Sequence, residues 1–452
     1  MTTGYVRTEM LPAQPAPAGT KGLVHWMKTN LFSSPLNTIA TLVALYALYL
    51  VIPSVIDFAL ISAVWSGVDR KACATIAQGG IQPDGWFGAC WPYIAANLKL
   101  FIYGRYPIDE IWRVNIVYLM FAVSAAGLLM PNLPFKRENA LFMFGVFPVV
   151  AFILLTGGHL ELNGFLVADL FMQPSITAFW VDFLILTAIF CCIAYLIARG
   201  TANDPKPGII NVLIGMAILA AVMVLVSAPF GLEPVSTSIW GGLLVTLVIA
   251  VTGIVASLPI GILLALGRRS KMPAVKLISV IFIEFWRGVP LITVLFMSSV
   301  MLPLFLPEGT DFDKLLRALI GVALFQSAYM AEVIRGGIQA LPKGQYEGAM
   351  ALGLSYWQMM QKIILPQALT LVIPGIVNTF IGLFKDTTLV LIIGLFDFLG
   401  QIQSSYSDPT WASPVQSLTG YFFAALVYCT FCYSMSRYSM YMEHRLDTGH
   451  RS

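Results

Sequence analysis

The sequence predicts an all-α integral membrane protein with about ten transmembrane helices. Two observations lead to this fold class: 58% of the residues are hydrophobic while only 11% are charged, and the apolar residues gather in long runs. A helix that crosses the hydrocarbon core of a bilayer needs roughly 20 predominantly apolar residues. The candidate spans lie at 36–62, 115–131, 139–156, 177–198, 209–228, 238–267, 276–306, 316–340, 367–396 and 417–436.

The chain begins with a polar segment. Residues 1–35 are rich in Pro, Ala and Thr and hold no apolar run, so they predict a disordered tail in the cytoplasm. A secretory signal peptide would need an apolar stretch of roughly 7–15 residues there. The first span is therefore expected to serve as an uncleaved signal anchor.

Lys and Arg in short loops predict the orientation, because cationic segments stay on the cytoplasmic side. Alternate loops carry cations, and the opposite loops carry acidic residues. The cationic set is Lys136, Arg137, Arg199, Lys206, Arg268, Arg269, Lys271, Lys276, Lys343 and Lys362, and the acidic set is Glu161, Asp169, Glu233, Asp397 and Asp408. Both termini, including the tail 441–452, are expected in the cytoplasm because Arg7, Lys21, Lys28, Arg437, Arg445 and Arg451 flank the outermost spans.

The segment 65–113 is an exception to this charge pattern. It should be external, yet it carries the cations Arg70, Lys71, Lys99, Arg105 and Arg113. Long loops cross a membrane largely regardless of their charge. We therefore still expect 65–113 to form an external loop.

Cysteine and histidine positions bear on redox state and metal binding. Cys73 and Cys90 lie in the predicted external loop, where they either form a disulfide or remain reduced thiols. The other cysteines, Cys191, Cys192, Cys429 and Cys432, lie inside apolar spans and are expected to pack there, with no metal site. The four histidines, His25, His159, His444 and His450, lie outside the spans and form no cluster, which argues against a membrane-embedded enzyme and against any catalytic residue.

The two halves of the chain differ in character. Few ionisable residues interrupt the helices of 36–228, which predicts an accessory bundle facing lipid. Residues 229–440 contain charged residues at repeated spacing and structured loops, so this half is expected to carry the function. The net charge of +3 gives no sign of nucleic-acid binding.

A repeated charge pattern occurs twice in the second half. Glu284 and Arg287 precede Gly288, and Glu332 and Arg335 precede a second glycine in the same way. Charges at membrane depth are costly and usually pair, so ion pairs within each helix or between helices are expected. Structural bracing is one interpretation of this pattern and a functional role is the other.

A polar cluster interrupts the span 367–396. It consists of Asn378, Thr379, Lys385, Asp386, Thr387 and Thr388. Polar side chains at this depth could hold a polar solute on its path through the membrane. The alternative is a segment that is partly unwound or paired with itself.

The loop 343–366 is structured and not a plain linker. Small residues Gly348, Ala349, Ala351 and Gly353 predict a thin helical surface that a groove on another protein can grip. Gly353 is expected to end the first helix, and Ser355 with a glutamine three residues later predicts a capping box that opens a second one. Two short helices outside the bilayer are expected.

This loop resembles the EAA loop of ABC-importer permeases. That pattern reads E-A-A, three residues, G, nine residues, I, one residue, L-P. The matching positions are Glu347, Gly348, Ala349, Gly353, Ile363, Leu365 and Pro366, and Gly348 is the only departure, standing where the family has Ala. The segments EFWRGVPL at 284–291 and KDTTLVL at 385–391 are similar to the polar amino-acid subgroup. The external segments Ala89-Cys-Trp-Pro and FIYGRYP resemble the general L-amino-acid permeases, in particular their M-type subunit.

The resemblance implies a type I ABC-importer core in the C-terminal five helices. It further implies an ATPase dimer, a related Q-type permease or a second copy of this chain, and a periplasmic amino-acid-binding protein as partners in the bacterial inner membrane, surrounded by lipid. ATP and Mg²⁺ would bind the ATPase, and no cofactor would bind this chain, whose sequence lacks a G-x-x-x-x-G-K-[ST] phosphate loop. The substrate would be a polar L-amino acid. The competing hypothesis is an ion-coupled secondary amino-acid transporter, which also needs charges at mid-membrane depth.

Overall fold

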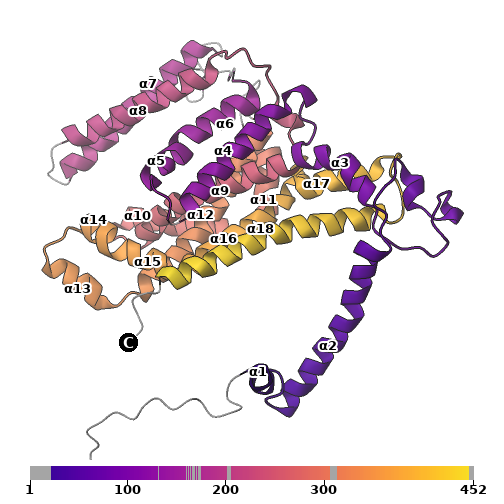
Figure 1. Cartoon of the computed structure of the whole chain (residues 1–452). Helices are drawn as coiled ribbons and strands as arrows, with labels where there is room; N and C mark the ends of the chain where they lie inside the picture. The colour runs from indigo at the N-terminus through magenta and orange to yellow at the C-terminus, as the bar shows by residue number, and fades with distance from the viewer. Residues whose placement is uncertain are drawn as a thin grey trace, which may run out of the picture. The chain divides into compact units, whose positions relative to one another are not determined.

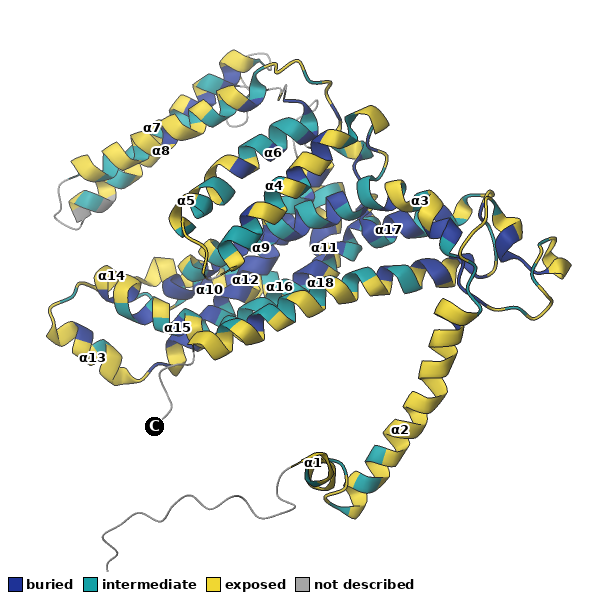
Figure 2. Ribbon diagram, viewed as in Figure 1, coloured by how far each residue is buried: buried dark blue, intermediate teal, exposed yellow. Residues whose placement is uncertain are grey.

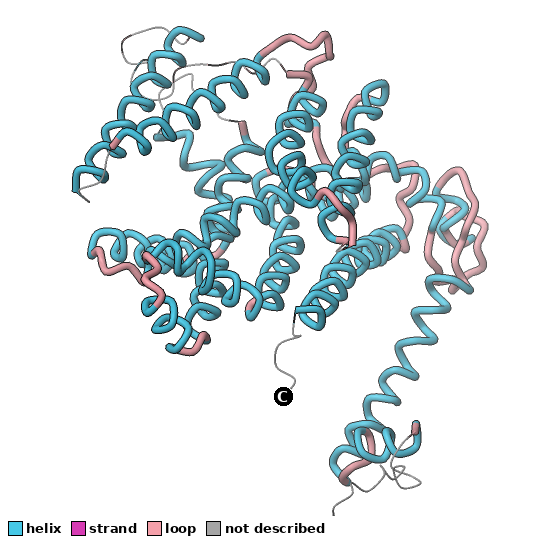
Figure 3. The backbone as a smooth tube through the Cα atoms, turned by 60° about the vertical axis from the view of Figure 1, so that its left-hand side comes forward, coloured by secondary structure: helices cyan, strands magenta, loops and turns pink. Residues whose placement is uncertain are grey.

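The computed structural model describes residues 22–130, 132–158, 160, 162, 164, 168, 171, 175–200, 205–305 and 313–446. Within these residues every extended regular element is a helix, and β-pairing is limited to isolated bridges (Figure 3). The all-α fold class is confirmed for this part of the chain. Residues 1–21 and 447–452, which include much of both predicted tails, lie outside the described residues, as do His159, Glu161 and Asp169.

Eighteen α-helices follow one another along the described residues. They are α1 (Leu23–Asn30), α2 (Pro35–Ile56), α3 (Trp91–Tyr103), α4 (Ile111–Leu129), α5 (Lys136–Leu141), α6 (Phe147–Thr156), α7 (Ile176–Gly200), α8 (Lys206–Ser227), α9 (Gly242–Arg268), α10 (Pro273–Gly288), α11 (Leu291–Phe296), α12 (Lys314–Ala340), α13 (Lys343–Ala351), α14 (Tyr356–Met359), α15 (Leu365–Leu371), α16 (Ile373–Asp386), α17 (Phe398–Ser404) and α18 (Gln416–Leu446). Figure 1 labels them.

Nine helical segments of the described chain are long and apolar enough to cross a bilayer. They are Pro35–Ile61, Ile108–Leu129, Lys136–Thr156, Ile176–Leu196, Lys206–Ser227, Gly242–Arg268, Lys314–Ala340, Ile373–Ile393 and Gln416–Leu446. Each corresponds to one of the predicted spans. The number rises to ten when one bent pair is counted as a single span.

The bent pair occupies the predicted span 276–306. There α10 and the helical run Leu291–Phe305 meet at an angle of 101°. Pro290 explains the break, because proline has no N–H for the helix ladder and its ring disfavours helical geometry in the preceding residue. Val289 is accordingly extended, with φ −109° and ψ 131°. Hydrophobicity predicted a continuous span here, and local backbone sterics interrupt it.

Helices α9 and α12 form the centre of the larger compact unit. Their buried faces appear dark blue in Figure 2. A Cβ atom at Gly261 of α9 would lie 2.7 Å from the side chain of Met330 on α12. Small residues let transmembrane helices approach closely, and in lipid that close packing is what holds helices together. The charged side chains near the ends of these two helices are thereby held at a fixed separation.

The predicted accessory bundle 36–228 is not a compact unit of its own. One unit comprises the described residues up to Ala95 together with Ser407–Thr419, and the other comprises Ala96–Tyr406 with the described residues from Gly420 onward. Helices α4 and α6 lie in the second unit, where Val114 and Phe147 join the same hydrophobic cluster as Val245 of α9. Helix α2 is different, since none of its residues is buried.

The segment 65–113, which was predicted to be an external loop, contains more structure than a loop. Short 3-10 turns precede α3, and a disulfide joins Cys73 to Cys90 with their Cα atoms 5.7 Å apart. Arg113, which conflicts with the charge pattern, is only 1% exposed within α4. Its guanidinium pairs with Glu110 at 2.6 Å and donates to the carbonyl oxygen of Glu233 at 2.7 Å. This cation is therefore neutralised inside the protein.

We expect Cys73→Ser to destabilise the smaller unit. The bond closes a loop with a sequence separation of 17 residues, and such closures contribute about 3 kcal/mol. Gel mobility of the alkylated, non-reduced protein will detect the bond, and limited proteolysis will report the stability of residues 62–95. Cys191→Ser, a change at an unpaired cysteine of α7, is the control. Equal proteolysis of the two variants would contradict the prediction.

Candidate functional site

The loop between α12 and α15 begins with the short helix α13. Gly353 ends it with a φ of +72°, a left-handed conformation that other residues rarely adopt. The capping box predicted at Ser355 is confirmed: its hydroxyl accepts from the N–H of Gln358, and the Gln358 side chain accepts from the N–H of Ser355. These two local signals set the turn between α13 and α14.

The second helix of the loop does not stand alone. Helix α14 continues through a π-helical turn at Met360–Ile364 into α15. Sequence analysis predicted two separate short helices, and the structure shows one separate helix and one continuous with the following run. Pro366 is the second residue of α15 and supplies no N–H to the helix ladder, yet the helical run continues through it.

The residues of the loop pattern divide into an outer and an inner set. Glu347, Gly348 and Gly353 are exposed, and a Cβ atom built at either glycine would meet no atom within 4 Å. Ala349 is instead 2% exposed and belongs to a hydrophobic cluster that Ile363 and Leu365 also contact. The expected thin surface is therefore narrower than predicted, because Ala349 packs inward. Pro366 is exposed.

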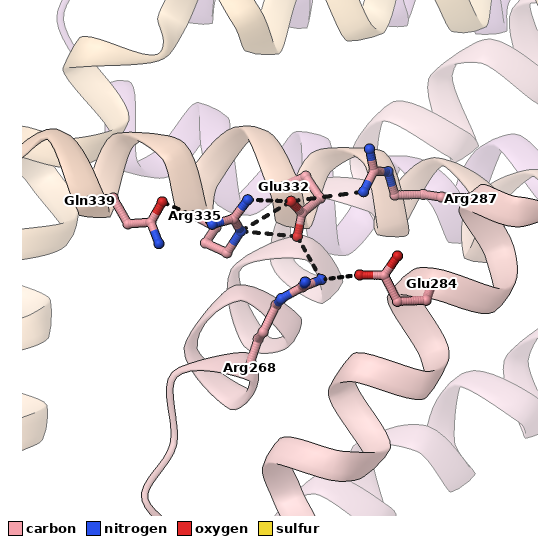
Figure 4. A network of polar contacts seen from close by, with 6 residues as sticks. All are labelled: Arg268, Glu284, Arg287, Glu332, Arg335 and Gln339. Atoms are coloured by element: carbon pink, nitrogen blue, oxygen red, sulfur yellow. Dashed lines mark hydrogen bonds and ion pairs between the residues drawn. The ribbon is translucent and has the colours of Figure 1, made fainter.

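A network of charged side chains connects α9, α10 and α12 (Figure 4). Arg335 forms a fork with Glu332, with its Nη2 atom 2.6 Å from Oε2 and its Nε atom 3.1 Å from Oε1. Arg268 lies between two carboxylates, 3.0 Å from Glu332 and 2.8 Å from Glu284. Arg287 approaches Glu332 to 3.8 Å, which is an ion pair without a hydrogen bond. Glu332 is the centre of this network because all three arginines approach its carboxylate, and its side chain is only 15% exposed.

The pairing differs in part from what the repeated pattern suggested. Glu332 and Arg335 pair one helical turn apart, whereas Glu284 pairs across helices with Arg268 and not with Arg287. Sequence analysis used Arg268 only as a cation of a cytoplasmic loop and missed its place in the network. Its position in the last turn of a span was the available signal, because long side chains there can reach neighbouring helices.

In the polar cluster of the span 367–396, Asn378 and Thr379 lie within α16, and the other members lie where α16 changes into a 3-10 helix, Thr387–Ile393. The three threonine hydroxyls of the cluster bond to their own helix: Thr379 donates to Gly375, Thr387 to Phe384 and Thr388 to Lys385. Thr387 is only 1% exposed. The self-paired alternative therefore describes the threonines, whereas Asn378 is exposed and Asp386 is half-buried.

Comparison with known proteins shows the family of this chain. The family described as "Binding-protein-dependent transport system inner membrane component" matches residues 257–448. The chain is 43% identical over 438 residues to the inner membrane amino-acid ABC transporter permease protein YhdY of Escherichia coli (strain K12), covering 97% of both chains. It belongs to the amino-acid ABC transporter permeases. The glutamate/glutamine/aspartate/asparagine transport system permease protein BztC of Rhodobacter capsulatus is also 43% identical, over 99% of both chains.

Shorter relatives match less than half of the permease. The glutamate/aspartate import permease protein GltK of Escherichia coli O6:H1 is 33% identical over 210 residues, which is 91% of that protein and 45% of this one. The matched family segment begins at residue 257, inside α9. The charge network and the loop both lie within that segment.

One buried polar group of the permease was missed by sequence analysis. Asp397, predicted to lie in an external loop, is 0% exposed. Its carboxylate accepts from the N–H groups of Leu399 and Gly400 and from the Tyr428 hydroxyl at 3.1 Å. Burial raises the pKa of Asp397 above its ordinary value, and these hydrogen bonds oppose the rise. Because it caps α17 next to a tyrosine of α18, we assign it to structure. No three metal-ligand side chains gather among the residues that were described.

We expect Glu332→Gln to destabilise the permease by about 2–3 kcal/mol, because the neutral amide leaves Arg268 and Arg335 without their central carboxylate. Thermal unfolding of the purified protein in detergent will measure the loss. Glu284→Gln is the matched control, since that side chain is 54% exposed and such pairs contribute at most about 1 kcal/mol. An equal effect of the two changes would contradict the central role of Glu332.

Proposed function

We propose that this permease is the membrane subunit of an ATP-driven importer that moves polar L-amino acids into the cytoplasm. The observation that supports it best is the loop 343–366, which carries the EAA-type pattern and presents Glu347 and Gly348 to the outside of the fold. The substrates in the printed names of the full-length relative BztC, glutamate, glutamine, aspartate and asparagine, are the first candidates for this chain.

A separate ATPase is the proposed partner of the exposed side of α13. Glu347, Gly348 and Gly353 form the outer set of pattern residues, and we define them as the docking face. Glycine at these positions lets a partner's surface approach the backbone closely. ATP and Mg²⁺ would bind that partner, and ATP-driven closure of an ATPase pair would move α13. A related Q-type permease or a second copy would complete the membrane part, and a periplasmic binding protein would deliver the solute.

The bacterial inner membrane is the proposed location, with both termini in the cytoplasm. The loop 343–366 must then face the cytoplasm, where ATP is available. In this orientation the segment with the Cys73–Cys90 disulfide is external, which agrees with the oxidising conditions that favour disulfides. Residues 441–452 would follow α18 on the cytoplasmic side, and lipid would cover the exposed apolar surface of α2.

The solute path is proposed to pass Asn378 and Asp386. Together with Lys385, these are the members of the polar cluster that are not fully buried and whose side chains have no hydroxyl bonded to the helix backbone. The ammonium and carboxylate groups of an amino acid need partners of both signs, and a partly buried carboxylate suits the ammonium group. Thr379, Thr387 and Thr388 would support the local backbone of this path.

We expect Gly348→Trp to lower amino-acid uptake by about five- to a hundredfold, because a bulky side chain in a packed interface costs about 1–3 kcal/mol. Gly348→Ala is the matched control: it restores the family's usual residue at an open position and should leave uptake unchanged. Co-purification of the ATPase with each variant will show whether docking is the step lost. Equal uptake by the two variants would count against the docking face.

The same assay distinguishes the proposed mechanism from an ion-coupled transporter. Uptake into cells or vesicles depleted of ATP, with ion gradients intact, should stop. Transport that continues under those conditions would favour the ion-coupled mechanism.

We expect Asp386→Asn to raise the KM for the transported amino acid by about ten- to a hundredfold, the range that follows from losing a hydrogen bond to a charged group. Asp109→Asn, at an exposed carboxylate before α4, is the control. Transport kinetics measured with the assembled importer will test it. Unchanged kinetics of Asp386→Asn for each of glutamate, glutamine, aspartate and asparagine would refute this path.

A further inference from the structure

The hydroxyl group of Tyr346 joins α13 to the end of α12. It donates a hydrogen bond to the backbone carbonyl oxygen of Ile338 at 3.0 Å. In a continuing helix that carbonyl would accept from the N–H group four residues later, but residue 342 is a proline, which has no N–H. Ile338 is only 1% exposed, so a carbonyl left open there would be costly. Pro342 therefore gives the Ile338 carbonyl oxygen no backbone donor, and the Tyr346 hydroxyl supplies a hydrogen bond in its place.

Arg269 contacts the same hydroxyl from a third helix. Its Nη1 atom donates to the Tyr346 oxygen at 3.2 Å, and its guanidinium carbon lies 5.7 Å from the centre of the tyrosine ring. Arg269 directly follows α9. One phenol group thus receives a hydrogen bond from the end of α9 and donates one to the last turns of α12.

The neighbouring residue extends this connection into the membrane core. Arg268, which precedes Arg269, reaches Glu332 of α12 and Glu284 of α10. The ends of α9 and α12 are therefore joined twice, once through Glu332 inside the span and once through Tyr346 at the loop. A displacement of α13 that keeps the Tyr346 contacts must carry both helix ends with it.

We propose that Tyr346 and Arg269 are positioning residues that transmit the movement of α13 to α9 and α12. This inference rests on the proposed function, in which an ATPase moves α13 from its exposed side. The Tyr346 ring packs against the hydrophobic cluster that includes Ala349, so the ring serves folding. The hydroxyl passes the movement of α13 to the other two helices. Without it, α13 can shift while α9 and α12 stay in place, and ATP is then hydrolysed without movement of solute.

The test uses Tyr346→Phe, which keeps the ring and removes both hydrogen bonds. The complete importer, with ATPase, second permease and binding protein, is reconstituted in vesicles, and ATP hydrolysed is measured per amino acid transported. We expect that ratio to rise at least about three- to tenfold, the factor that one lost hydrogen bond contributes, because two are removed. Tyr433→Phe, at a tyrosine of α18 that is 64% exposed, is the matched control and should leave the ratio unchanged.

A second variant examines whether Arg269 acts through the same group. Arg269→Ala should raise the ratio, and combining it with Tyr346→Phe should add little, because the two changes disrupt one shared contact. An unchanged ratio in Tyr346→Phe overturns the proposal, and so does a complex that no longer assembles, since the hydroxyl would then serve docking or folding. Failure of the unaltered importer to couple uptake to ATP would instead overturn the proposed function.

Discussion

The carboxylate of Glu332 is the contact on which the arrangement of the permease core depends. It lies on α12 and accepts from Arg335 of its own helix and Arg268 of α9, while Arg287 of α10 approaches to 3.8 Å. An arginine at membrane depth is tolerated only beside an opposite charge or water. Glu332 is therefore what allows three helices to carry cations toward one another. Without it, Arg335 and Arg287 would lose their carboxylate partner, and Glu284 alone would remain beside Arg268.

The loop 343–366 follows this core directly, and it has one side that packs on the core and one side that is open. The outer set, Glu347, Gly348 and Gly353, has no internal packing to lose, so a partner can contact it without disturbing the fold. The inner residue Ala349 is buried among apolar side chains. A thin helix with one anchored side and one open side can pass a displacement inward. A fully exposed helix could not, since nothing would resist its rotation.

The sequence predicted those features that depend on local chemistry. Nine of the ten predicted spans, the end of α13 near Gly353 and the capping box at Ser355 follow from hydropathy, backbone freedom and short-range hydrogen bonds, and the described part of the structure contains all of them. What it could not predict depends on residues distant in the chain. Arg268 joins Glu332 across 64 positions, and the buried Asp397 accepts a hydrogen bond from Tyr428 on another helix. Pro290 is a local signal for a break in the helix, yet the long apolar run around it led to the prediction of one continuous span.

The N-terminal half shows why composition alone does not predict which helices pack against the core. Helices α2 and α6 carry no charged residue and α4 carries only Arg113, and all three were predicted as one lipid-facing bundle. Yet Val114 and Phe147 are buried in the same cluster as Val245 and Val322 of the core, while no residue of α2 is buried. Moving an apolar helix face from lipid into the protein brings no hydrophobic free energy, because lipid tails are equally apolar. Close packing and polar contacts therefore decide which helices associate. Arg113 supplies such a contact, because its buried guanidinium needs Glu110 and the Glu233 carbonyl. That need ties α4 to the segment before α9, and it makes part of the N-terminal half a structural component of the core.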